Sequence, residues 1–293
     1  EWKWDMTALS NLNLSKTVAD LLADQIGKLD DEIKYILKFA SFFGNTFDLK
    51  TLAIVLDRPV LSVSQRLNIA VQAGFISVKN VTSNQENPKI EYIFFHDKVH
   101  QAFYNLESGI KKDGIHFTIG SRLLTYFDNP TKDELILMIP HLNAAISLFN
   151  NFDDVLKIAQ NNLKLAHTLK DNYSYEHARV YFTSGAGILS ESDFVAHEEL
   201  VGSLLLGQME CDFVLGDFDS ANSIFEFLIQ NSKDLLRKGS VYRIKVQLCT
   251  RLGLYDDAIA IGVEGLNLLS FSMQSCVSYP KLFLYYVMLR YRL

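Results

Sequence analysis

The sequence predicts a mainly α-helical protein, and three patterns lead to that prediction. Apolar residues recur every three or four positions before residue 74 and again after residue 109, which is typical of amphipathic helices. A β-branched and aromatic run at residues 90–95 is typical of a strand, and residues 75–78 supply a partner for one antiparallel hairpin. An aromatic–x–x–Ala pattern also recurs in the second half, beginning at Tyr175, Phe218 and Tyr255.

Residues 17–110 are expected to form a small domain of helices that closes on a hairpin and a final helix. Polar starts and Gly or Pro stops delimit the predicted helices. These helices begin near Thr17, after Asp30, after Asp48 and after Pro59, and Gly44 and Gly74 end two of them. Helices followed by one β-hairpin and a further helix are the order of a winged-helix domain. Residues 1–16 show little periodicity and are expected to be an N-terminal extension.

The junction between the strand at 90–95 and the helix that follows contains His96 and Asp97. A carboxylate at such a position can accept hydrogen bonds from the free N–H groups of the first helical turn, so Asp97 is expected to cap the helix. His96 is then fixed where strand meets helix. Two roles stay open for it: its side chain is aimed at a partner domain, or it simply caps or packs at the junction.

Residues 111–293 are expected to form a TPR-like α-solenoid. In the recurring pattern a Gly or Asn allows a turn, an aromatic residue covers a groove, and a small Ala lets two helices approach closely. The intervals between the aromatic residues are 43 and 37 residues, longer than the roughly 34 of a strict tetratricopeptide repeat. We expect helix pairs to turn near Gly216 and Gly253, with Ala221 and Ala258 buried against the preceding helix.

Composition and charge restrict the classes of partner. The net charge of −6 and the pI of about 5.7 argue against polyanions such as nucleic acid or an anionic membrane. Three widely spaced cysteines argue against a disulfide framework and favour a reducing, cytoplasmic compartment. The chain begins without Met and stops inside an apparently helical run, so it is expected to be a piece of a longer protein.

A search for chemistry predicts that this chain is not an enzyme and holds no cofactor. It has no Gly-x-x-x-x-Gly-Lys-Ser/Thr phosphate loop and no Gly-x-Ser-x-Gly nucleophile elbow. His96 and His100 stand at i and i+4, where they could share a helix face as metal ligands. No third ligand stands at a recognisable spacing, so no metal site is predicted.

A winged helix can bind DNA, and DNA binding requires an excess of basic residues. The candidate recognition helix, residues 60–73, carries one basic residue, Arg66. Residues 18–108 contain nine Lys and Arg against eleven Asp and Glu, a net charge of −2. A duplex reader needs several phosphate contacts at physiological salt. The charges therefore favour a winged helix that packs against protein.

Several segments resemble one family. Phe95-His96-Asp97 resembles the Met-His-Asp motif in the winged helix of signal-transduction ATPases with numerous domains, the STAND class, with Phe in place of Met. Residues 18–22, 26–30, 40–52 and 95–104 look like a bacterial group of hybrid proteins within that class. Members of this group combine a Ser/Thr kinase domain, an AAA-type ATPase, a winged-helix and repeat region, and GAF and histidine-kinase domains.

The resemblance implies a role for His96 and a cofactor for the parent protein. In the STAND class the motif histidine reaches the β-phosphate of ADP in the neighbouring NTPase domain and locks the resting state. His96 and Asp97 are accordingly the predicted nucleotide-sensing residues, and the parent is expected to use ATP or ADP with Mg. The predicted function is a non-catalytic regulatory region whose repeat arm binds a protein or another domain of the parent. The alternative is a DNA-binding transcriptional regulator that uses the winged helix.

Overall fold

The structure is a computed structural model that describes residues 24–82, 89–189, 196–271 and 287–288. Its contacts divide the chain into two compact units, Glu1–Asn150 and Asn151–Leu293. The expected extension at 1–16 and most of the helix expected from Thr17 lie outside the described residues, although residues 24–27 are helical. Each unit is described below by itself.

The first unit begins with helices that start at side-chain caps. These are α3 (Asp31–Ser41) and α4 (Leu49–Leu56), and α5 (Val60–Gln72) follows them after Pro59 without a side-chain cap. Asp30 accepts a hydrogen bond from the Glu32 N–H at 2.8 Å, and Asp48 accepts one from Thr51, also at 2.8 Å. Each bond satisfies a backbone donor that the helix leaves free. The apolar faces of the three helices meet in a core that includes the fully buried Ile36, Leu37, Leu52 and Leu67.

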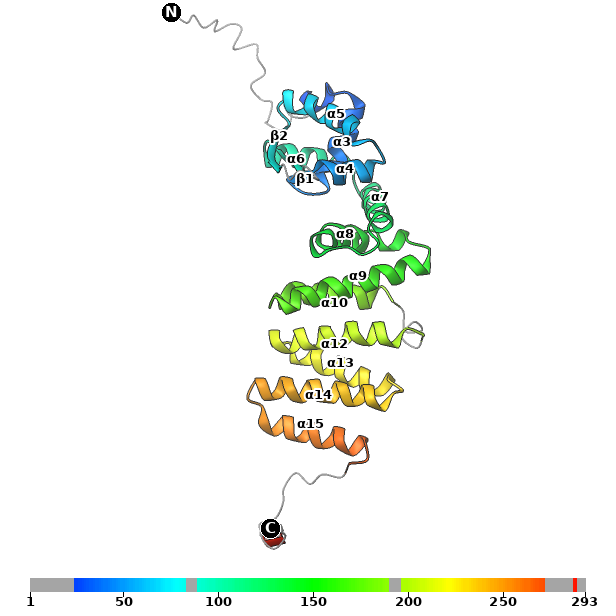
Figure 1. The fold of residues 1–293 in the computed structure, drawn as a ribbon, viewed down its shortest axis with the longest axis vertical. Coiled ribbons are helices and arrows are strands. Elements are labelled where there is room, and N and C mark those ends of the chain that lie inside the picture. Colours follow the sequence, from blue (N-terminus) through cyan, green and yellow to red (C-terminus); the bar gives the residue numbers. More distant parts are fainter. Residues whose placement is uncertain (1–23, 83–88, 190–195, 272–286, 289–293) are drawn as a thin grey trace, which may run out of the picture. The chain divides into compact units, whose positions relative to one another are not determined.

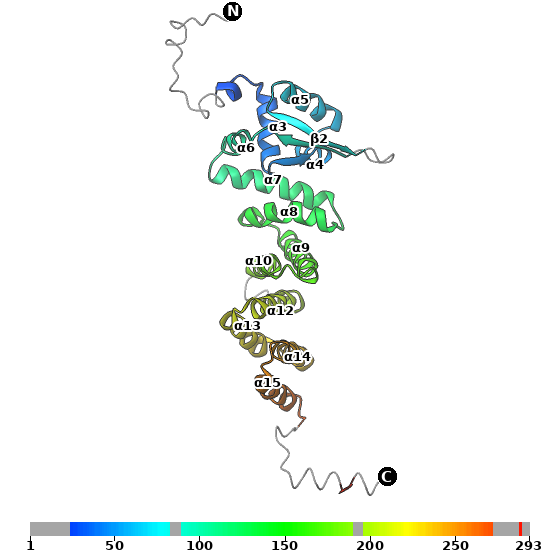
Figure 2. The same cartoon turned by 90° about the vertical axis from the view of Figure 1, so that its left-hand side faces the viewer.

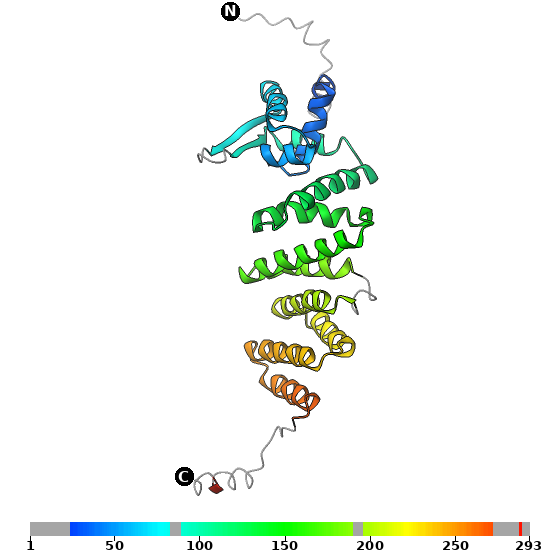
Figure 3. The ribbon, with the colours of Figure 1, turned by 45° about the vertical axis from the view of Figure 1, so that its right-hand side comes forward.

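The sheet of this unit has three antiparallel strands in the order β1-β3-β2. They are β1 (Thr46–Asp48), β2 (Ile76–Thr82) and β3 (Lys89–Phe94). The predicted hairpin is present as β2 and β3, with Ile76 opposite Phe94 and Val78 opposite Tyr92. It extends from the helices as the cyan ribbon in Figures 2 and 3. Strand β1 is not predicted from the sequence, because three residues are too few to show an alternating pattern.

Three further helical segments complete the first unit. They are α6 (Asp97–Tyr104), α7 (Ile110–Tyr126) and α8 (Lys132–Ala144), with the short 3-10 turn η1 (Ile146–Leu148) after them. An added Cβ at Gly120 in α7 would lie 2.8 Å from Leu142 in α8, so these two helices approach closely. Helix α7 also packs against α4. The contact boundary therefore falls after Asn150, later than the domain boundary expected at residue 110.

The second unit is a stack of antiparallel helix pairs, as Figure 1 shows for α9 to α15. Its helices are α9 (Phe152–Asp171), α10 (Tyr175–Gly187), α12 (Glu198–Leu215), α13 (Phe218–Asn231), α14 (Leu235–Arg251) and α15 (Tyr255–Leu268). The recurring aromatic residue is the first residue of the second helix in each pair. The fold is thus mainly α, a winged helix followed by a TPR-like solenoid, as the sequence predicts.

The turns and small residues of the repeats lie where the pattern places them. Gly216 and Gly253 have φ of 84° and 77°, a left-handed conformation that glycine adopts without a steric penalty. Ala221 is 1% exposed and Ala258 is 6% exposed. Both features of the prediction are therefore confirmed. Among the described residues, no helix is both long and apolar enough to cross a membrane.

Candidate functional site

The β3–α6 junction is held on both sides by backbone hydrogen bonds. The Phe94 N–H donates to the Asn45 carbonyl at 2.9 Å, and the Phe95 N–H donates to the Phe75 carbonyl at 3.0 Å. The helix that follows is anchored by Val99 and Phe103, which are buried, and α6 packs on α3. The main chain of the residues between them is consequently fixed from the strand and from the helix.

His96 is the N-cap of α6. Its Nδ1 accepts a hydrogen bond from the Lys98 N–H at 3.0 Å, with an extended backbone at φ −151° and ψ 146°. The prediction that Asp97 caps this helix is wrong: Asp97 is already the first helical residue. Its carboxylate lies in the first turn, where it interacts favourably with the positive end of the helix dipole.

The cap determines which nitrogen of His96 carries the proton. A ring nitrogen that accepts a hydrogen bond must be unprotonated, so a neutral His96 carries its proton on Nε2. The residue is exposed. One side of the ring is therefore committed to the helix, while the other side has a donor free to meet an acceptor outside the unit.

His100 has a different role from His96. Its Nε2 lies 2.8 Å from the Ser41 carbonyl oxygen, so that nitrogen donates to the end of α3. Its ring packs against Phe94, with centroids 5.4 Å apart. The two histidines therefore do not join as a ligand pair. No group of three or more His, Cys, Asp or Glu side chains in the described part of the chain is arranged to hold a metal ion.

Phe95, which stands where the resembling motif has Met, is 73% exposed. Its main chain is fixed by the bond to Phe75, so the ring remains at the surface beside His96. A large exposed ring next to an exposed donor is more typical of a contact surface than of a core position. The replacement of Met by Phe keeps an apolar side chain at this position of the motif, and within the first unit that side chain is left exposed.

The basic charge of the candidate recognition helix α5 is paired with a carboxylate of the same unit. Arg66, its one basic residue, forms an ion pair with Glu32 at 2.7 Å. The neighbouring Arg58 bonds the same carboxylate at 2.6 Å. Several residues on the solvent side are apolar: Leu61 is 71% exposed, and Val60 and Ile69 are also exposed. Such a face is suited to protein rather than to phosphate.

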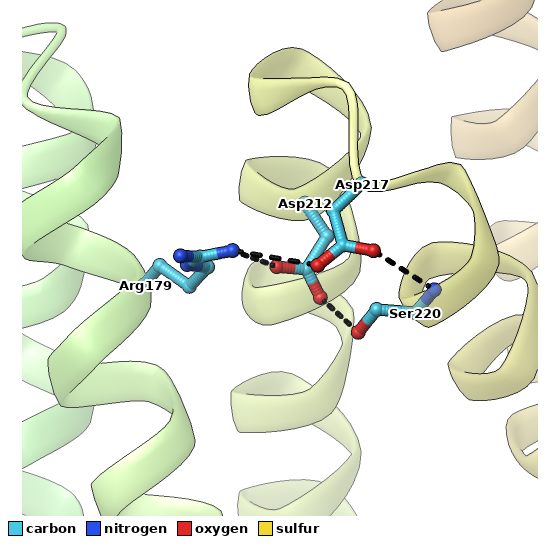
Figure 4. Close-up of polar contacts among 4 residues, drawn as sticks. All are labelled: Arg179, Asp212, Asp217 and Ser220. Carbon is cyan, nitrogen blue, oxygen red and sulfur yellow. Dashed lines mark hydrogen bonds and ion pairs between the residues drawn. The ribbon is translucent and has the colours of Figure 1, made fainter.

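In the second unit a polar network joins the helices α10, α12 and α13, as Figure 4 shows. Asp212 of α12 is 1% exposed; its carboxylate accepts a hydrogen bond from the Ser220 hydroxyl of α13 at 2.7 Å. Arg179 of α10 lies 3.5 Å from the same carboxylate and 3.6 Å from Asp217. A buried carboxylate needs such partners. Sequence reasoning did not find this network, because its members are separated along the chain and belong to different helices.

No protein-family model matches the chain. A hybrid signal transduction histidine kinase G from Dictyostelium discoideum is 21% identical over 325 residues, which cover 91% of this chain. The chain spans about 9% of the length of that curated relative. The solved structure of a STAND protein with a tetratricopeptide repeat sensor, from Pyrococcus horikoshii, aligns with a TM-score of 0.37 and 14% identity, over 87% of this chain and 40% of that one. The chain is thus similar to a region of a signal-transduction protein.

Proposed function

We propose that this chain is a non-catalytic regulatory region of a larger signal-transduction protein with ATPase and kinase domains. The winged helix senses the nucleotide state of a neighbouring NTPase domain through His96, and the repeat arm binds a protein or another domain of the parent. The similarity to a hybrid signal transduction histidine kinase and the resemblance of Phe95-His96-Asp97 to the STAND motif support this function. A bacterial origin rests on the sequence resemblance alone.

Nucleotide sensing is best supported by the different roles of the two ring nitrogens of His96. Nδ1 holds the α6 cap, which orients the ring, and Nε2 is left as a donor at an exposed position. A phosphate oxygen of ADP is a charged acceptor that this donor suits. The ATP or ADP, with its Mg, would be held by the parent. Asp97 acts as a positioning residue, because its carboxylate stabilises the turn that holds the ring.

The size of the effect follows from one charge-assisted hydrogen bond. Such a bond contributes about 1.5–3 kcal/mol. Losing it would shift a two-state equilibrium between resting and active forms by about tenfold to a hundredfold. That shift is large enough to release a resting state that is favoured by a similar amount.

Two substitutions separate sensing from capping in the protein that contains this chain and its NTPase domain. His96→Asn keeps a good N-cap acceptor, but its shorter side chain cannot place a donor where Nε2 lies, whereas His96→Ala removes both the acceptor and the donor. We expect both variants to lose ADP affinity by about tenfold or more and to signal without stimulus. Only His96→Ala should melt lower. If His96→Asn binds ADP as tightly as the wild-type protein, His96 only caps α6 and the sensing proposal is wrong.

The remaining parts of the proposal concern partner and compartment. We assign the arm to protein binding, because its described helices form the antiparallel stack of a TPR-like solenoid. We place the protein in the cytoplasm, since Cys211 and Cys249 are both buried free thiols. Burial raises the pKa of Cys211 to about 12, so its thiol stays protonated and unreactive. DNA binding is the less supported alternative, because the Arg66 charge on α5 is already paired.

A further inference from the structure

A cavity of about 530 Å³ lies within the first unit, lined by the β1–β3 edge of the sheet, α4, the end of α7 and the start of α8. Pockets for small organic ligands typically have roughly 300–1,000 Å³. Aromatic and aliphatic side chains, among them Phe43, Phe47, Ile54 and Phe127, supply much of the lining. The cavity is therefore large enough and apolar enough to hold the body of an organic molecule.

The charged residues of this cavity are mostly acidic. The lining contains four carboxylates and two ammonium groups: those of Asp48, Glu91, Asp133 and Glu134, and those of Lys50 and Lys89. Asp48 and Glu91 are partners across the β1–β3 ladder. Like charges directly opposite each other on neighbouring strands destabilise a sheet. A cation at this place would relieve that repulsion.

The protein supplies part of the compensation. Lys89 Nζ lies 2.9 Å from Glu91 Oε1. The hydrogen bond between them raises the pKa of Lys89 and lowers the pKa of Glu91, so the pair stays ionised at neutral pH. Glu134 is likewise occupied, because its Oε2 accepts the Thr131 N–H at 2.7 Å in the α8 capping box.

Only one of the two carboxylate oxygens of Asp48 accepts hydrogen bonds from the described residues. Its Oδ2 accepts hydrogen bonds from the Thr51 backbone at 2.8 Å and from the Thr51 hydroxyl at 2.9 Å. Its Oδ1 is buried and accepts no hydrogen bond from any described residue. A buried carboxylate oxygen without a donor is costly. Asp48 and Asp133 are also close enough to Lys89 to raise its pKa, so the single Lys89 ammonium group interacts with three carboxylates, those of Glu91, Asp48 and Asp133.

We propose that this cavity binds an organic cation with an apolar body, whose ammonium or guanidinium group lies beside the Asp48–Glu91 pair while its hydrocarbon part contacts Phe47 and Phe127. The cation is supplied either by a free amine or by a basic side chain of a peptide. This site is independent of the nucleotide contact proposed for His96, since the acidic lining repels phosphate.

The probe that tests the charge requirement is 4-phenylbutylamine, with neutral 4-phenylbutan-1-ol as its matched control. Calorimetric titration of the full 293-residue chain should show the amine binding at least tenfold more tightly than the alcohol. A capped Leu-Arg-Leu peptide distinguishes the two sources of the cation. Binding of the peptide, or of the amine at least tenfold more tightly than the alcohol, supports the site. Equal binding of amine and alcohol, or no binding of amine and peptide, overturns it.

Matched substitutions then locate the binding. The double variant Asp48→Asn with Glu91→Gln removes two charges, and asparagine keeps a capping oxygen for α4. We expect at least tenfold weaker binding of the cation that the wild-type chain binds and no fall in melting temperature, because the cross-strand repulsion is gone. Asp153→Asn, an exposed carboxylate on α9, should change nothing. Wild-type affinity in the double variant overturns the proposal. If that variant melts lower, Asp133→Asn replaces it, and unchanged affinity there has the same consequence.

Discussion

The two units hold their side chains in place by different means. In the first unit individual residues hold particular elements: His96 caps α6, the central strand β3 is bonded on both sides, and the buried His141 contacts His116. In the second unit one contact recurs, in which the aromatic first residue of a helix is followed by a buried Ala. The first unit can therefore hold one residue such as His96 in a defined orientation, whereas the second offers a repeated surface.

The first prediction concerns the effect of low pH, because the first unit buries His141 against the half-buried His116. Nδ1 of His116 lies 2.9 Å from Nδ1 of His141, and burial lowers the pKa of His141 to about 3. The unfolded chain, with a pKa of about 6.5, takes up the proton first. Stability is therefore fully present above pH 6.5 and falls as the pH drops toward 3, by up to about 5 kcal/mol.

Hydrogen exchange on the whole chain can measure this loss separately in each unit. Between pH 7 and pH 5, α7 and α8 should lose more protection than α12 and α13, after correction for the intrinsic exchange rate. In His141→Asn, which cannot take up the proton, most of the extra loss in the first unit should disappear; a smaller part remains, because burial also lowers the pKa of His116. Equal losses in both units would show that carboxylates, and not this pair, set the acid sensitivity.

The second prediction concerns close packing in the solenoid. A Cβ added at Gly207 of α12 would lie 2.3 Å from the Phe182 ring of α10, which is fully buried. Gly207→Ala should therefore overpack the crossing and destabilise the second unit by about 1–3 kcal/mol. Gly202 is on the same helix with nothing within 4 Å of its added Cβ. Gly202→Ala should stabilise by about 0.5–1 kcal/mol in urea unfolding, and a loss in both variants would refute the packing explanation.

What the sequence could predict and what it could not depends on the range of the interactions involved. The helices expected after Asp30, after Asp48 and after Pro59, the β2–β3 hairpin and the turns at Gly216 and Gly253 follow from local patterns, and the structure confirms them. The strand β1 could not be found, because its pairing with β3 depends on residues more than forty positions away. The same holds for the Asp48–Glu91 pair, which exists only through that register.

The site itself was predicted in part. The junction of strand and helix at residues 95–97 follows from the change of period, and its position is confirmed. The capping residue was misassigned, because carboxylates cap helices far more often than imidazoles do. Backbone geometry decides the matter: His96 is extended and lies just before the first helical residue, so its Nδ1 is the atom within reach of the Lys98 N–H.

The last prediction compares two carboxylates that share Arg179. Asp212 is 1% exposed and bonded to the Ser220 hydroxyl, whereas the Asp217 side chain is 47% exposed and caps α13. Asp212→Asn keeps an acceptor for Ser220 but removes a buried charge from beside Arg179, so it should cost about 1–2 kcal/mol. Asp217→Asn keeps the cap and loses only an exposed ion pair, for a cost under about 1 kcal/mol.

Both variants convert a carboxylate beside the same guanidinium to an amide. The difference between their free energies of unfolding therefore reports the effect of burial. Urea unfolding in low and high salt should show the Asp217→Asn effect vanish at high salt, since exposed charges are screened. The Asp212→Asn effect should persist, because Asp212 is almost completely enclosed. If the two variants respond to salt alike, the network of Figure 4 is a surface ion pair and does not bind the three helices together.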